Sequence, residues 1–150
     1  MAKFKFRLAT LLRLREAARD QRREELAEAY RADDLLREQL ARTEEEIGWL
    51  RNQCRRVAAP GTINVDQLVE AQRYEVVLKV RQKQLQGQRE QIGAEIERRR
   101  QALVVANRNV RVLEKLREHQ ARRHRETENR QEIKQLDEAA GLLAAREDVW

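Results

Sequence analysis

The chain's only proline, Pro60, lies in the segment Ala59-Pro60-Gly61-Thr62 and separates two long tracts that each carry a heptad repeat. The residue before a proline avoids helical geometry and glycine commonly follows the end of a helix, so one helix is expected to end here. On both sides, largely apolar positions recur at alternating spacings of 3 and 4 residues. In the first tract these positions are Leu26, Ala29, Asp33, Leu36, Leu40, Thr43, Ile47, Leu50, Cys54 and Val57. In the second tract they are Leu68, Ala71, Glu75, Leu78, Gln82, Leu85, Arg89, Ile92, Ile96, Arg99, Leu103, Ala106, Val110 and Leu113. Such a repeat keeps one face of a helix turned towards a partner helix, so the sequence predicts an all-α fold, a long antiparallel two-helix coiled-coil hairpin.

The two arms of this hairpin are expected to be unequal. We predict a single coiled-coil domain over residues 1–150, with a first helix at about 4–58, a turn at 59–64 and a second helix at about 65–145. Asn64 and Gln67 have the spacing of a capping box at the start of the second helix. Antiparallel pairing across the turn makes the numbers of facing residues add up to about 125, which places Leu36 opposite Leu85 and Arg89.

The second helix therefore overhangs, because about 25 residues beyond His119 have no partner helix in the chain. An unpaired helix of that length is marginal in water unless something covers its apolar stripe. The stripe here consists of Leu116, Ile133, Leu136, Ala140 and Leu143. Two interpretations stay open, a frayed and solvated tail or a helix that enters another protein.

Composition restricts the class of protein. Charged residues make up 39% of the chain and aromatic residues 4%, which suits a narrow two-helix seam better than a broad core. The lone Cys54 is expected to pack in the seam as a small apolar side chain. No apolar stretch is long enough to span a bilayer and no secretory leader is visible, so we expect a soluble cytoplasmic protein without direct membrane insertion.

Nothing in the sequence predicts catalysis. The glycines do not form a phosphate-binding loop, and the histidines, His119 and His124, are five residues apart and so do not share a helical face. We therefore expect no enzyme activity, no metal site and no cofactor. Polar residues at seam positions, such as Asp33, Arg89 and Arg99, are expected to reach out to solvent with their charged ends.

The net charge of +6 is unevenly distributed. Residues 1–15 carry +5 and residues 98–125 carry +8, whereas residues 16–97 carry −3 and residues 126–150 carry −4. Arg98-Arg99-Arg100 and the run from Arg122 to Arg125 could contact phosphates, which keeps nucleic-acid binding as an alternative. No aromatic side chains lie nearby to stack on bases, and no zipper adjoins a basic region, so we expect no nucleic-acid partner.

Three segments together resemble FliJ, the small coiled-coil component of the bacterial flagellar type III export apparatus. Residues 4–16, FKFRLATLLRLRE, are similar to the family's opening F-x-F-x-L-x-x-L-L-x-x-[RK]-E. In the stretch from Leu68 to Leu85, Tyr74 takes the place of an aromatic residue that is followed four residues later by Leu78. Residues 128–140, ENRQEIKQLDEAA, are similar to the family's E-x-R-x-[ED]-Q-K-x-[LM]-D-E, with Ile133 where the family often has glutamine.

The resemblance implies a hairpin similar to the stalk subunit of rotary ATPases. Its paired-termini end would enter the pore of the hexameric export ATPase FliI, the turn side would contact the export gate FlhA, and export chaperones would be further partners. The protein would then act at the cytoplasmic face of the inner membrane in flagellum assembly and motility. The alternatives are a generic coiled-coil scaffold or the stalk of a virulence-type secretion system.

The resemblance also implies which residues make these contacts. The expected apolar plug at the ATPase end consists of Phe4, Phe6, Leu8, Leu11, Leu12, Leu113 and Leu116. The matched charged positions of the tail are Arg130, Lys134, Asp137 and Glu138. Tyr74 and Leu78 are expected to contact the export gate.

Overall fold

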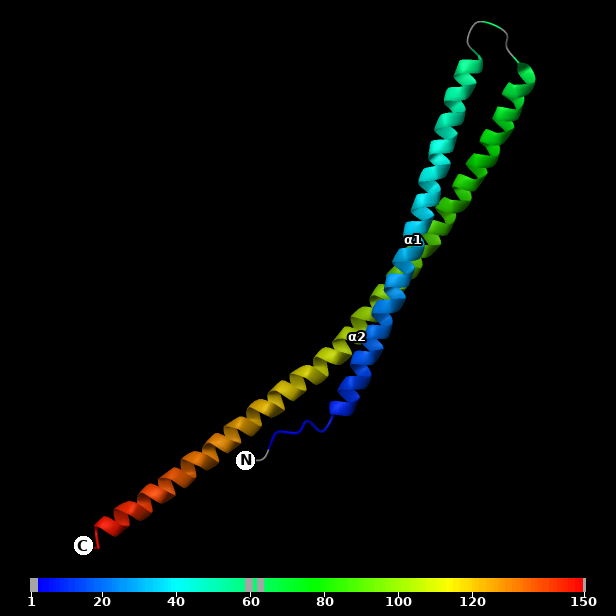
Figure 1. The fold of residues 1–150 in the computed structure, drawn as a ribbon. Coiled ribbons are helices and arrows are strands. Elements are labelled where there is room, and N and C mark those ends of the chain that lie inside the picture. The colour runs from blue at the N-terminus through cyan, green and yellow to red at the C-terminus, as the bar shows by residue number, and fades with distance from the viewer. Residues whose placement is uncertain (1–2, 59–60, 62–63, 150) are drawn as a thin grey trace. The chain divides into compact units, whose positions relative to one another are not determined.

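Two long helices make up the structure, a computed structural model that describes residues 3–58, 61 and 64–149. Helix α1 runs over Ala9–Val57 and helix α2 over Val65–Glu147, 49 and 83 residues long, and they pack antiparallel (Figure 1). The described residues contain no strand. The all-α hairpin with unequal arms is confirmed.

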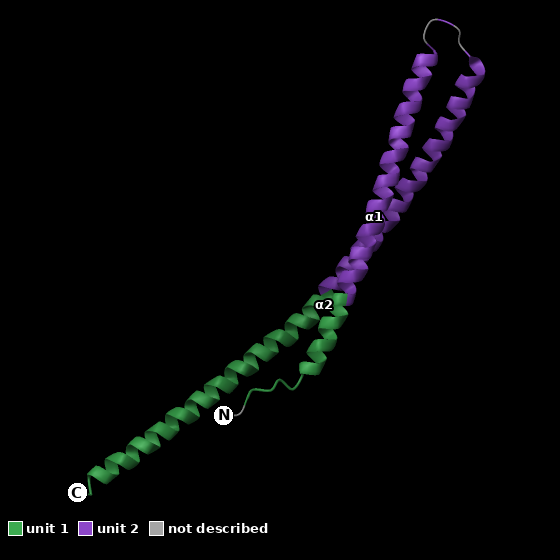
Figure 2. Cartoon of the chain, viewed as in Figure 1, with its two compact units in different colours: residues 1–20, 105–150 green, residues 21–104 purple. Residues whose placement is uncertain are grey.

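The chain divides into two compact units. Unit 1 consists of Met1–Asp20 and Val105–Trp150, and unit 2 consists of Gln21–Val104 (Figure 2). Each unit contains a stretch of α1 packed on a stretch of α2. The expectation of a single domain over the whole chain stays a prediction.

The seam of unit 2 follows the heptad pattern. Every heptad position that the sequence assigns to it is buried or half-buried, and Leu78, Thr43 and Ala29 are the most enclosed, at 2–4% exposed. Ile47, Leu50 and Leu78 form one apolar cluster. The Thr43 hydroxyl donates to the carbonyl oxygen of Gln39 at 2.9 Å, so this polar group is satisfied within its own helix.

Polar residues in the same seam pair across it and also reach solvent. Arg89 Nε donates to Asp33 Oδ1 at 3.1 Å, and both side chains keep part of their surface in water. Arg99 donates to the backbone carbonyl of Glu25 on α1. The residue numbers of these two pairs add up to 122 and 124, close to the expected 125. Arg51 and Glu75, which lie 2.9 Å apart, form a third pair across the seam, and their numbers add up to 126. The predicted register is therefore confirmed in this unit.

The start of α2 has half of the expected capping box. The backbone N–H of Gln67 donates to Asn64 Oδ1 at a long 3.5 Å. Asp66 lies in the first turn of α2, where a negative charge suits the helix dipole. Ala59, Pro60 and Thr62 of the predicted turn lie outside the described residues.

The first helix begins at Ala9, later than the expected start at about residue 4. The residues before it alternate between exposed and half-buried, with Phe4, Phe6 and Leu8 on the less exposed side. A period of two residues is that of an extended chain and not of a helix, since successive side chains of an extended chain point to opposite sides. The helical prediction for residues 4–8 was therefore wrong, and the second helix ends within two residues of its expected end.

Candidate functional site

The N-terminal segment, residues 3–8, packs on the helices of unit 1 with its apolar side chains. Phe6 and Leu8 lie against an apolar cluster of Leu12, Val110 and Leu113, each at most 8% exposed. The backbone N–H of Ala9 donates to the carbonyl of Phe6 at 3.2 Å, which turns the segment into the first residues of α1. The segment thereby extends the covered stretch of α2 beyond the point where α1 begins (Figure 1).

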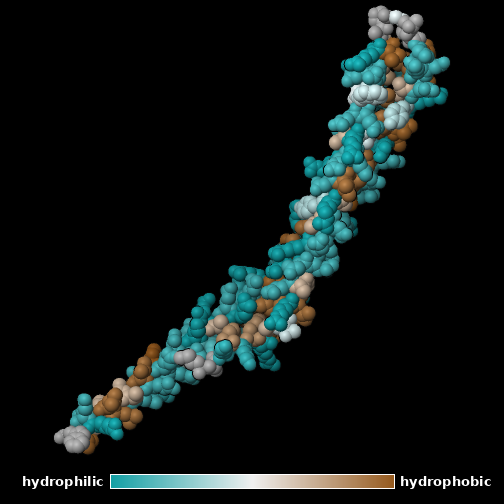
Figure 3. Space-filling model, viewed as in Figure 1, coloured by the Kyte–Doolittle hydropathy of each residue, from teal (hydrophilic) through white to brown (hydrophobic). Residues whose placement is uncertain are grey.

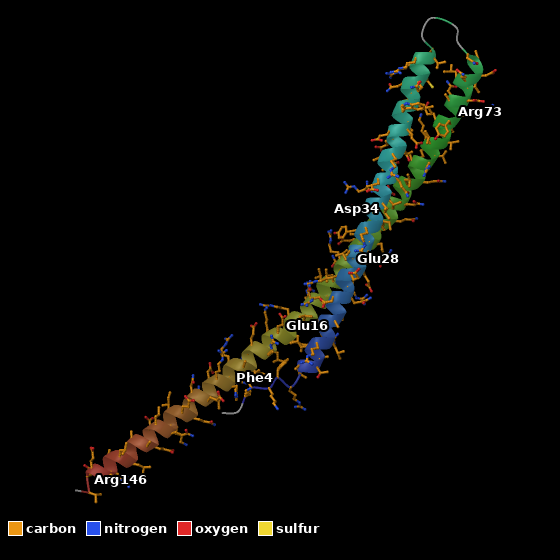
Figure 4. The ribbon with its side chains drawn as sticks, viewed as in Figure 1. Phe4, Glu16, Glu28, Asp34, Arg73 and Arg146 are labelled. Carbon is orange, nitrogen blue, oxygen red and sulfur yellow. The ribbon has the colours of Figure 1, made fainter. Side chains whose placement is uncertain are left out.

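Phe4 and His124 mark the far end of this covered stretch. Phe4 reaches from the segment to α2, and its ring centroid lies 5.8 Å from that of His124, with the ring planes at 36° (Figure 4). His124 Nε2 lies 3.2 Å from Glu128 Oε1, one helical turn further on. A shallow cavity of about 390 Å³ lies beside Phe4 and is lined by Phe4, Arg117, Glu118, Ala121, Arg122 and Arg125.

Unit 1 concentrates positive charge on this paired stretch. Residues 3–20 and 105–125 together hold thirteen basic side chains against four acidic ones, whereas unit 2 holds sixteen against fifteen. Within the part of the chain that is described, Arg117, Arg122 and Arg125 make no ion pair. A surface with this excess of positive charge favours a negatively charged partner.

Residues 129–149, which we call the tail, comprise the end of α2 and the two residues after it, and they are exposed at every position. Ile133, Leu136 and Leu143 are 58–68% exposed, and they recur at the spacing of one helical face. Figure 3 shows apolar patches among hydrophilic surface towards the C-terminal end of α2. The tail carries three basic and five acidic side chains, so it differs in charge from the stretch before it.

A family model described as the flagellar FliJ protein matches residues 4–148. The chain belongs to the FliJ family. No curated protein and no solved structure gives a significant match. FliJ proteins are non-catalytic components of flagellar protein export. The chain therefore has a role related to flagellar export.

The residues expected to form the FliJ plug lie mainly in the interior of unit 1. Leu12 and Leu113 are buried, and Phe4, Phe6, Leu8 and Leu116 are half-buried. Leu11 is the most exposed of the set, at 37%. Of this set, Phe6 and Leu8 pack with Leu12 and Leu113 and so hold the N-terminal segment on the hairpin. The surface that this end offers to a partner is made by the basic side chains around them.

The matched tail positions of the family are all accessible. Arg130, Lys134, Asp137 and Glu138 are exposed, and among the described residues none of them has an ion-pair partner. Lys134 follows Arg130 by four residues, and Asp137 and Glu138 follow Lys134 by three and four, so the four side chains line one side of the helix. The tail is therefore open to a partner along both its apolar stripe and its charged side.

The two residues expected to contact the export gate differ in exposure. Leu78 is 2% exposed and belongs to the seam cluster of unit 2, which leaves it no surface for a partner. Tyr74 is 49% exposed, and its hydroxyl donates to Glu46 Oε2 on α1 at 3.2 Å. The negative charge of Glu46, together with this hydrogen bond, raises the pKa of Tyr74.

The arginine triplet that suggested phosphate contacts is engaged within unit 2. Arg98 lies 2.6 Å from Glu95, and Arg99 bonds both Glu95 and the α1 backbone. Arg100 donates to the Tyr30 hydroxyl at 2.7 Å, and this contact raises the pKa of Arg100. These bonds reduce the charge that the triplet could offer to a nucleic acid.

Over the described residues, no cluster of possible metal ligands is present, and no helix is long and apolar enough to cross a membrane. Sequence reasoning missed the packing of Phe4 on His124. The alternation of Phe4, Phe6 and Leu8 with basic residues could have indicated that this segment is not helical, because a period of two favours an extended chain over a helix.

Proposed function

We propose that this FliJ-family chain is a non-catalytic stalk that inserts into the hexameric export ATPase FliI and links it to the export gate FlhA. The ATPase end would consist of the tail and the basic surface of unit 1. The protein would then work as a peripheral component at the cytoplasmic face of the inner membrane and regulate the ATPase during flagellum assembly, with export chaperones as further partners.

The exposed tail carries this proposal. A long helix with an uncovered apolar stripe is marginal in water, so a stripe at Ile133, Leu136 and Leu143 calls for a covering surface. The interior of a ring could supply that surface and could also offer charges to Lys134 and Asp137. A rod bound in a pore would act through differential contacts with subunits in different states, and it needs no chemistry of its own.

The basic surface gives a second line of support. Lys5 and Arg7 are exposed while Phe6 and Leu8 pack on the apolar cluster, and Arg117, Arg122 and Arg125 line the cavity beside Phe4. Acidic loops at the mouth of a ring would meet an excess of positive charge here and a net negative tail further along. A change of sign along one helix would fix how deep the stalk sits.

The charge-reversed variant Lys134→Glu with Asp137→Arg tests the proposal. Both side chains are exposed, so the helical signal in circular dichroism should stay unchanged while stimulation of purified FliI is lost. Arg42→Glu with Glu45→Arg is the matched control, since it reverses two exposed charges at the same spacing on α1 of unit 2. Retained stimulation by the tail variant, or an equal loss in the control, would refute the role of the tail.

A further inference from the structure

Valine is unusually concentrated at the beginning of α2. Five of the chain's eleven valines lie between residues 65 and 80, and all five are exposed by 40–63%. They are Val65, Val69, Val76, Val77 and Val80. A β-branched side chain loses rotamer freedom in a helix and is a weaker helix former than Ala, Glu or Lys. Contact with water alone does not favour valine at these positions.

These valines lie on the side of α2 that is turned away from α1. Val69 and Val76 each precede a seam residue, Ala71 and Leu78, by two positions, which is about 200° around the helix. Val80 follows Val76 by one turn. We call Val69, Val76 and Val80, with Val65 and Val77 at the edges, the valine face.

The valine face has the spacing of a second helix-packing seam. Val69, Arg73, Val76, Val80 and Lys83 follow one another at intervals of 4, 3, 4 and 3 residues. This is the repeat that the first seam uses to pack on α1. Gly87 continues the row, and apart from its chain neighbours and the backbone of its own helix nothing lies within 4 Å of the place that a Cβ would take, so a partner backbone could approach closely there.

Two basic side chains accompany the valines. Arg73 and Lys83 are exposed, and within the described ranges neither makes an ion pair, whereas neighbouring Lys79 binds Glu75 at 3.2 Å. Figure 4 shows Arg73 near the start of α2. A partner helix packed on the row would therefore meet positive charge among its apolar contacts, which favours carboxylates on that partner.

We propose that the valine face binds an amphipathic helix of another protein, whose apolar stripe packs on the valines and whose flanking carboxylates pair with Arg73 and Lys83. A second copy of this chain fits poorly, because two such faces would bring Arg73 and Lys83 against the same basic residues. The face is also separate from Tyr74, which bonds Glu46 on the α1 side. The proposal goes beyond the ATPase-binding role of the tail and does not depend on it.

Two synthetic peptides test the proposal with the full chain. Both are 21-residue amphipathic helices with leucine and isoleucine in a 3–4 repeat, one with glutamate and one with lysine beside the stripe. In fluorescence anisotropy the glutamate peptide should bind at least about tenfold more tightly than the lysine peptide. Arg73→Glu with Lys83→Glu should reverse this preference, which a general stickiness of the surface would not do.

Substitution of the valines gives the second measurement. Val76→Lys with Val80→Lys should weaken binding of the glutamate peptide at least about tenfold, while Val112→Lys, at a valine of unit 1 that is 65% exposed, should leave it unchanged. Both variants should keep their helicity, because lysine is a good helix former.

Three outcomes would overturn the proposal. The first is that neither peptide binds, and the second is that Val112→Lys weakens binding as much as the valine-face variant does. The third is a dimer of the unmodified chain, seen in sedimentation velocity, that Val76→Lys with Val80→Lys dissociates, since the face would then be a contact between copies. Stimulation of the ATPase should survive in the valine-face variant, so the outcome is independent of the proposed stalk function.

Discussion

A substitution at Leu78 tests whether this residue packs in the seam or contacts the export gate, the role that the family resemblance assigns to it. The side chain is 2% exposed and packs with Ile47 and Leu50. Leu78→Ala removes three buried carbon atoms, each worth about 0.8 kcal/mol of transfer free energy, so the loss is about 2.4 kcal/mol. Both flanks of a two-helix seam are open to water, so the cavity term should be small. We expect a total loss of about 2–3 kcal/mol, the low end for Leu→Ala in a core.

The assay is urea unfolding followed by circular dichroism at 222 nm, with the midpoint and the slope both fitted. Val77→Ala is the matched control, because Val77 is the neighbouring residue on α2, is 60% exposed and should change the free energy of unfolding by less than about 0.5 kcal/mol. If Leu78→Ala lost less than about 1 kcal/mol, or no more than the control, the seam as described would be wrong. A gate contact alone would lower partner binding and leave the unfolding curve in place.

Three further predictions concern polar and aromatic contacts. Replacing both Asp33 and Arg89 by leucine should raise the urea midpoint, because a partly solvated ion pair is worth about 0–1 kcal/mol whereas two leucines would add apolar contacts to the seam. An unchanged or lower midpoint would contradict this. The absorbance of Tyr74 at 295 nm should titrate above the usual tyrosine range because Glu46 raises the pKa of Tyr74, and Glu46→Gln should lower that pKa. Since the folded state favours the neutral phenol, Tyr74 stabilises the fold below pH 10, and this stabilisation is lost as the pH rises through the raised pKa. Phe6→Ala should release the N-terminal segment, which is checked by faster tryptic cleavage within residues 3–8 at an almost unchanged urea midpoint, and cleavage at the unmodified rate would show that Phe6 does not anchor the segment.

Periodicity predicted the seam well because burial in a two-helix seam depends mainly on where a residue lies around the helix axis. A residue such as Thr43 or Gln82 becomes enclosed through its position on the helix, whatever its polarity, so spacing identified both as seam residues. The single turn signal then fixed the register, since only one way of folding back brings Asp33 level with Arg89. Helix pairing of this kind leaves few alternatives for a sequence to distinguish.

The N-terminal segment was mispredicted because two patterns overlap in it. The basic and apolar composition of residues 4–8 suits a helix, and the helix that follows continues directly from it. Whether Phe4 and Phe6 pack as part of a helix or as an extended strap depends on the shape of α2 opposite them, including His124. The period of two in the segment favours the extended form, but it does not identify the residues of α2 on which the segment packs.

The site residues show why a family motif predicts importance more reliably than contact. Leu12 and Leu78 match family positions and are buried in their own hairpin, whereas the tail stripe with Leu136 has the same kind of apolar spacing and is exposed. Spacing states which side of a helix avoids water, and it does not state whether the covering surface belongs to the same chain. Only the length of α1 decides that, because α1 and the segment before it reach no further along α2 than the neighbourhood of His124. The same reasoning applies to Val76, where α1 occupies the opposite side of α2, so α1 covers neither of the two exposed rows.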